Sequence, residues 1–117
     1  MSEKTPIVCR HYHRAVELIG RRWTGAVLQV LMGGRTRYCE IRGAIPEVSD
    51  RMLSERLKEL EAEGIVVRIV TPDTPVRVEY ELTDKGRALE QALGAVAAWA
   101  EEWKDAPAQA SARAMRA

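Results

Sequence analysis

The chain has 117 residues, a net charge of +1 and an apolar fraction of 46%. This length fits one domain, and the composition fits a packed core. The chain contains no apolar run of about eighteen residues, and its polar N-terminus lacks an apolar signal core. We therefore expect a cytoplasmic protein that neither spans a membrane nor is exported. Cys9 and Cys39 are its only cysteines, which excludes a disulfide scaffold.

The charge is unevenly distributed along the chain. Residues 1–42 hold eight lysines or arginines and three glutamates, so this part carries +5. The remainder carries −4, because the total is +1. Phosphate groups respond to a local basic patch rather than to the total charge. The near-neutral total therefore does not exclude binding to nucleic acid.

Two helices are predicted before the centre of the chain. The first covers residues 9–19 and is closed by Gly20. The second covers residues 22–32 and is stopped by the glycine pair that follows it. Each has apolar residues on one side. On the first these are Tyr12, Ala15, Val16 and Ile19, and on the second they are Trp23, Val27, Val30 and Leu31.

Residues 39–64 read as two helices separated by a tight turn. A short helix at 39–45 would bury Ile41 and Ile45, and Pro46 would end it. Ser49 is a good N-cap for a longer helix, which Gly64 would terminate. Leucines at positions 53, 57 and 60 form one buried stripe on this helix, and the opposite face is polar. The pattern is typical of a helix-turn-helix, although an ordinary helical hairpin would share it.

The periodicity changes after Gly64. Residues 65–70 and 76–82 are rich in β-formers, and the second segment alternates between apolar and polar residues. The five residues between them include Pro72 and Pro75, which suit a loop. A helix-turn-helix followed by a β-hairpin predicts a winged helix, with the hairpin at 65–82 as the wing. The expected fold class is therefore α+β.

A last helix is predicted from the Thr83 cap to about Trp103. Its apolar stripe is long for a solvated terminal helix, and it consists of Leu89, Leu93, Val96, Ala100 and Trp103. The stripe could pack on the chain's own core. We favour a dimer interface shared with helix 9–19, because a winged helix already has a closed core. Residues 1–8 are expected to form a flexible arm and residues 104–117 a disordered tail.

Six segments together resemble one known family. They are the cysteine that opens the first helix, ELIGRRWTGAVLQVL, TRYCEIRGAI, PEVSDRMLSERLKELEAEGIVVR, PVRVEYELTDKGRAL and a closing AAWAEEW. They closely resemble the HxlR family of bacterial winged helix-turn-helix transcription regulators, over roughly residues 9–103.

The resemblance carries implications for assembly and signalling. It implies a homodimer built through the terminal helices, 9–20 and 84–103, on a two-fold symmetric operator. Several relatives sense oxidants or electrophiles through the N-terminal cysteine. Two features depart from the family pattern. Arg10 stands where such relatives often have proline. The family often has two glycines before the Trp-Thr pair, whereas this chain has Gly20 followed by Arg21 and Arg22.

DNA contacts should divide into base reading and backbone positioning. For reading we propose the first turns of the longer helix, namely Ser49, Asp50, Arg51, Ser54 and Glu55. Arg51 could donate two hydrogen bonds to a guanine, or it could pair with Glu55 on the surface. Lys58 and Arg77 are expected at phosphates, as are Arg35 and Arg37. Arg77 could instead pair with a carboxylate, such as Glu79.

Cys9 is the other candidate for chemistry. It lies at a helix N-terminus among basic and imidazole side chains, which favour a reactive thiolate. It is therefore either a redox or electrophile sensor or an inert residue of the dimer contact. Cys39 is expected to be structural. His11 and His13 lie nearby, but a helix would point His11 away, so we expect no metal site.

The predicted function is sequence-specific DNA binding by a homodimeric transcription regulator that responds to redox or electrophile signals through Cys9. The alternative is a winged-helix module that binds protein instead of DNA. The sequence has no nucleophile–base pair and no phosphate-binding loop, so neither an enzymatic activity nor a cofactor is expected.

Overall fold

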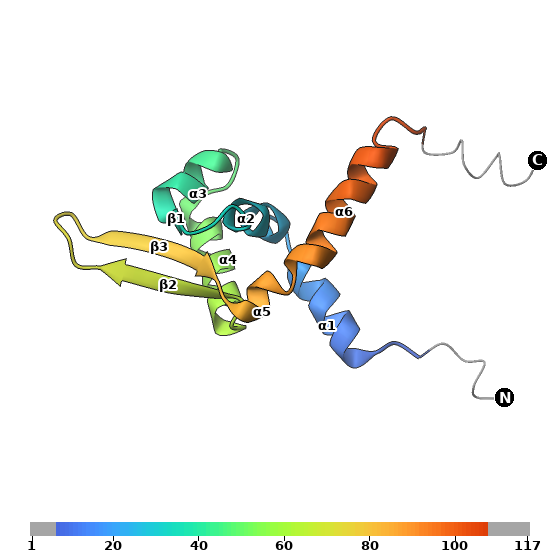
Figure 1. Cartoon of the computed structure of the whole chain (residues 1–117), viewed down its shortest axis with the longest axis horizontal. Helices are drawn as coiled ribbons and strands as arrows, with labels where there is room; N and C mark the ends of the chain where they lie inside the picture. Colours follow the sequence, from blue (N-terminus) through green and yellow to red (C-terminus); the bar gives the residue numbers. More distant parts are fainter. Residues whose placement is uncertain (1–6, 108–117) are drawn as a thin grey trace, which may run out of the picture. The chain divides into compact units, whose positions relative to one another are not determined.

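The computed structural model describes residues 7–107 and forms two units, residues 1–87 and 88–117. The first unit contains α1 (Arg10–Ile19), α2 (Thr24–Leu31), β1 (Thr36–Arg37), α3 (Tyr38–Ala44), α4 (Asp50–Ala62), β2 (Val66–Thr71), β3 (Arg77–Leu82) and α5 (Asp84–Arg87). The second contains α6 (Glu90–Trp103). Figure 1 labels these elements along the chain. The arm and the tail predicted from the sequence lie mostly outside the described residues.

The helix-turn-helix consists of α3 and α4, as predicted. Ser49 caps α4 by accepting a hydrogen bond from the Met52 amide at 3.1 Å. Gly64 follows the helix at φ +74°, a conformation that costs glycine little because it has no Cβ. The three leucines of α4 at positions 53, 57 and 60 are completely buried. The α4 stripe is therefore part of the core.

The wing is an antiparallel hairpin of β2 and β3, and its loop lies at the end farthest from α4 in Figure 1. The short strand β1 pairs with the other edge of β3, which gives a three-stranded sheet in the order β1-β3-β2. Thr36 lies opposite Tyr80 in this pairing. The sequence had indicated only that the residues before α3 could be extended. Their pairing attaches the middle of β3 to the start of the helix-turn-helix.

The core lies between α2, α3, α4 and the sheet. Its apolar residues are Val27, Leu28, Leu31, Ile41, Ile45, Val48, Leu53, Leu57, Leu60, Ile65, Val66, Tyr80 and Leu82. Val48 was not predicted, and it anchors the turn immediately before the Ser49 cap. Burying one such aliphatic side chain stabilises a fold by roughly 1.5–3 kcal/mol. The core therefore holds α4 with one face against the protein and the other in solvent.

The second predicted helix begins later than expected. It starts at Thr24 rather than Arg22, because Trp23 adopts a left-handed backbone conformation with φ +77°. Trp23 is only partly buried, whereas Thr24 is almost inaccessible. Left-handed backbone at a bulky residue costs roughly 1–3 kcal/mol and persists only when its surroundings hold it. Local propensities do not indicate where this joint between α1 and α2 lies.

The single helix predicted from Thr83 to Trp103 is interrupted. Thr83 does cap the first part, since its hydroxyl accepts from the Gly86 amide at 3.1 Å. That part ends at Arg87, and a turn at residues 88–89 precedes α6. Gly86 is required here, because a Cβ would lie 2.2 Å from the Ile65 carbonyl oxygen. The turn contains neither proline nor glycine, so the sequence carries no signal for it.

Neither terminal helix contributes a buried residue. On α1, Tyr12 is 68% exposed and Val16 is also exposed. On α6, Val96, Trp99 and Trp103 are exposed. No helix within residues 7–107 is long and apolar enough to cross a membrane.

Candidate DNA-binding surface

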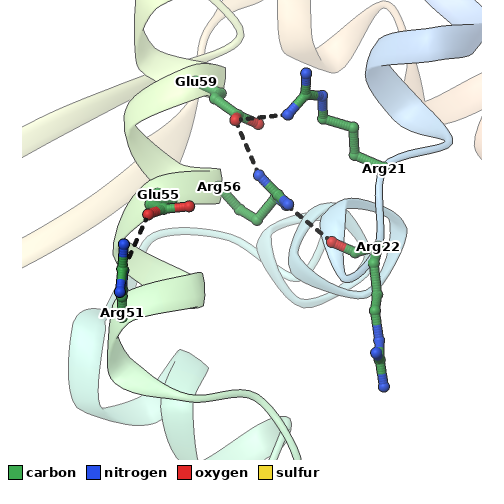
Figure 2. Close-up of polar contacts among 6 residues, drawn as sticks. All are labelled: Arg21, Arg22, Arg51, Glu55, Arg56 and Glu59. Atoms are coloured by element: carbon green, nitrogen blue, oxygen red, sulfur yellow. Dashed lines mark hydrogen bonds and ion pairs between the residues drawn. The ribbon is translucent and has the colours of Figure 1, made fainter.

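The proposed reading residues lie on the solvent side of the first turns of α4. Arg51 is highly accessible, with 90% of its side chain exposed. Its Nε donates to Glu55 Oε1 at 3.4 Å, so the surface pair considered as an alternative is present. Figure 2 shows this pair on one side of α4. An exposed i, i+4 pair contributes only about 0.3–0.5 kcal/mol and can be exchanged for a stronger contact.

Asp50 and Ser54 are already engaged within the protein. Arg42 Nε donates to Asp50 Oδ1 at 2.7 Å. The Tyr38 hydroxyl lies 3.3 Å from both Asp50 Oδ1 and Ser54 Oγ, and 3.2 Å from the Asp50 carbonyl oxygen. These bonds join α3 to the first turn of α4. Tyr38 and Arg42 were not predicted as part of this surface, because no local sequence pattern pairs residues 8 to 16 positions apart.

Lys58 is exposed one turn beyond Ser54 and Glu55. This part of α4 also belongs to the predicted DNA-binding surface. Beyond Lys58, Glu61 is exposed, whereas Glu59 and the C-cap residue Glu63 have arginine partners on α1 or between α1 and α2. Their negative charge is thus partly balanced by the protein itself.

The predicted backbone contacts divide into two groups. Arg37 and Arg77 line one cleft of about 570 Å³ between the wing loop and the start of α3. The residues around it are Arg37, Tyr38, Cys39, Asp73, Thr74, Pro75, Val76, Arg77 and Val78. Arg77 pairs with Asp73 at 3.2 Å, so its partner is in the wing loop rather than at Glu79.

Arg35 lies elsewhere. Its guanidinium is 3.5 Å from a Glu81 carboxylate oxygen and 3.9 Å from a Glu79 oxygen. It therefore bridges two carboxylates of β3, and half of its side chain remains exposed. Arg37 and Arg77 are brought together by the fold, whereas Arg35 is directed to the sheet.

The two cysteines are both exposed and both free. Cys9 is the N-cap of α1, and its side chain makes no capping hydrogen bond. Cys39 was expected to be structural, and this was wrong, because it lies on the rim of the wing cleft rather than in the core. No group of three or more His, Cys, Asp or Glu residues within 7–107 could hold a metal ion.

The exposed face of α4, the wing and their order along the chain correspond to a known group of proteins. A family model described as HxlR-like helix-turn-helix matches residues 18–108. The chain belongs to the HxlR-like helix-turn-helix family. As a member it is a DNA-binding transcription regulator with a winged helix-turn-helix fold.

Relatives in Bacillus subtilis (strain 168) support this assignment. The HTH-type transcriptional regulator YvaP is 50% identical over 98 residues, covering 84% of this chain and 91% of YvaP. The HTH-type transcriptional regulator YodB is 47% identical over 96 residues, covering 82% of this chain and 86% of YodB.

Solved structures of similar proteins share the fold. The reduced form of YodB from B. subtilis has a TM-score of 0.76 at 44% identity, and covers 86% of this chain and 99% of its own. The redox regulator HypR in its oxidized form has a TM-score of 0.74 at 37% identity, with 79% and 95% covered. YodB has also been solved after diamide treatment and with a bound quinone.

Proposed function

We propose that this HxlR-like regulator acts in the cytoplasm as a homodimer that binds a two-fold symmetric operator. The observation that carries the proposal is the contrast between its exposed surfaces. The start of α4 exposes a polar, arginine-bearing tip, whereas α1 and α6 expose valine, tyrosine and tryptophan side chains. A second copy of the chain is the partner that would cover such apolar faces and place two α4 tips on one DNA.

Base reading is assigned chiefly to Arg51. Its guanidinium has the planar fork that matches guanine O6 and N7, and it has to release only Glu55. Asp50 and Ser54 are assigned a supporting role, because Arg42 and Tyr38 already occupy their polar atoms. Arg37 and Arg77 at the wing cleft are assigned to the DNA backbone, with Lys58 on α4 and Arg35 as further phosphate contacts.

Salt dependence tests DNA binding against the protein-interaction alternative. Each phosphate neutralised by Lys or Arg releases counterions, so log affinity should fall steeply and linearly with log salt. Operators selected from a random duplex pool should be inverted repeats. An affinity that is independent of salt, or a selected pool without symmetry, would contradict the proposal.

We also propose that Cys9 carries a response to oxidants or electrophiles. The thiol is exposed at the N-terminus of α1, next to the face assigned to the dimer. The relatives YodB and HypR, solved in diamide-treated, quinone-bound or oxidized forms, support this assignment.

Diamide treatment followed by measurement of operator affinity tests the sensor. We expect wild-type affinity to change by about tenfold or more, which is about 1.4 kcal/mol of coupling. The variant Cys9→Ala should not respond. Cys39→Ala, which removes the other exposed thiol, serves as the matched control and should respond like wild type. Equal responses of the two variants would exclude Cys9 as the sensor.

A further inference from the structure

A cluster of three arginines and a glutamate ties the C-terminal half of α4 to the region around the end of α1. Glu59 Oε2 accepts from Arg56 at 2.9 Å and from Arg21 at 3.0 Å. Arg56 Nε also donates to the carbonyl oxygen of Arg22 at 2.9 Å. Figure 2 shows Arg56 and Glu59 turned toward Arg21 and Arg22, away from the Arg51–Glu55 pair.

Arg56 is the inner member of this cluster. Only 11% of its side chain is exposed, and Arg51 on the same helix is 90% exposed. A buried guanidinium loses hydration and needs fixed partners, which Glu59 and the Arg22 carbonyl supply. Glu59 Oε1 is also buried, and no described residue donates a hydrogen bond to it. The carboxylate is thus held through one oxygen, and Arg21 and Arg56 are the partners that fix it.

The carbonyl that Arg56 holds belongs to the strained joint between α1 and α2. It precedes Trp23, whose left-handed backbone persists only if neighbouring contacts hold it. The Arg22 guanidinium lies 5.0 Å from the centre of the Trp23 ring, which adds a cation–π contact at the same joint. One turn beyond Glu59, Arg14 of α1 pairs with Glu63 at 3.3 Å. Three contacts therefore hold α1 and the joint after it against the C-terminal half of α4. They are Arg21 with Glu59, Arg56 with the Arg22 carbonyl and Arg14 with Glu63.

We propose that Glu59, together with Arg56 and Arg21, is a positioning group that sets the spacing of half-sites that the dimer accepts. The proposal rests on the proposed function, in which α1 belongs to the dimer contact and α4 reads DNA. None of the three side chains needs to touch DNA. They act by fixing the angle between α1 and α4.

The distance along α4 from Glu59 to the helix tip is long enough for a change of angle to alter the half-site spacing measurably. Asp50 precedes Glu59 by nine residues, which is about 14 Å of helix at about 1.5 Å per residue. A tilt of roughly 15° about Glu59 would move the α4 tip by about 3.5 Å, close to one base-pair step of about 3.4 Å. One base pair added or removed also rotates one half-site by about 35° about the DNA axis. A rigid joint should therefore reject such an operator, and a loosened joint should tolerate it better.

The experiment uses an inverted-repeat duplex selected by the wild-type protein from a random pool. Affinity is measured for this duplex, for two versions with the centre lengthened or shortened by one base pair, and for an isolated half-site. The proteins are wild type, Arg21→Gln and Glu59→Gln. Arg87→Gln is the matched control, because Arg87 is similarly exposed and pairs with Glu81 of the wing, outside the cluster.

We expect Arg21→Gln and Glu59→Gln to reduce the preference for the correct spacing by about tenfold, with half-site affinity within about twofold of wild type. Arg87→Gln should keep the full preference. A uniform loss of affinity on every duplex would show that the cluster only supports folding, and would overturn the proposal. Arg21 is half exposed, so Arg21→Gln should fold even if Glu59→Gln folds poorly. The proposal can then be tested with Arg21→Gln alone. If wild type itself binds no duplex in a salt-dependent manner, the proposed function fails instead.

Discussion

The helices α4 and α6 are nearly equal in length, at 13 and 14 residues, but they differ in what they bury. α4 buries three leucines completely and leaves its other face polar. α6 carries more apolar residues along its length, and none of them is buried. The difference shows that an apolar stripe indicates a contact without saying which molecule provides it. In α4 the contact is the core, and for α6 we have proposed a second copy of the chain.

The largest expected effect tests the α4 side of this comparison. Leu57→Ala should lower the free energy of unfolding by about 2–5 kcal/mol, because it leaves a cavity in a fully buried site. The matched control is Lys58→Ala, its exposed neighbour, which should change stability by no more than about 0.5 kcal/mol. Denaturant titration followed by circular dichroism measures both. Similar losses for the two variants would contradict the assigned core.

The α6 side should respond in the opposite way. Replacing Trp99 and Trp103 together with serine should weaken self-association by about 30-fold or more, since aromatic anchors dominate interfaces. Sedimentation measures the association. The control is Glu101→Ala on the same helix, which should self-associate like wild type. A tryptophan variant that associates normally would remove α6 from the dimer interface.

A third prediction concerns the polar face of α4. Arg51→Ala should lose about 1–3 kcal/mol of discrimination at one base pair of each half-site. Glu61→Ala, exposed near the other end of the helix, is the control and should keep the base preference. Competition with operators substituted one position at a time provides the measurement. Unchanged preferences in Arg51→Ala would move the reading face away from the first turns.

The smallest expected effect concerns the start of α4. Ser49→Ala removes the side-chain oxygen that accepts from Met52, and should cost about 1 kcal/mol of stability. Ser49→Asp, which restores an acceptor, should recover most of it. Thermal unfolding at matched protein concentration distinguishes the two. If both variants were as stable as wild type, the cap would contribute nothing to the start of the helix.

The candidate DNA-binding surface could be predicted only in part. Arg51 and Lys58 are exposed where the helical pattern places them, because the leucine stripe determines which face of α4 is turned to solvent. The actual partners of Asp50, Ser54 and Arg35 were not predictable. Tyr38 lies 16 residues before Ser54, and Glu81 lies 46 residues after Arg35, so only the packing of separate elements brings them together.

By itself, the sequence determined the features that depend on neighbours along the chain. These are the Ser49 cap, the positive φ at Gly64, the leucine stripe of α4 and the alternation that makes the wing. Each follows from local sterics and from the period of a helix or strand.

The tertiary structure alone decided the left-handed joint at Trp23, the turn before α6 and the Arg56–Glu59 link to the end of α1. At Trp23 and at the Arg56–Glu59 link, contacts between separate elements outweigh the local preference of the chain. No short stretch of sequence contains the residues that produce them.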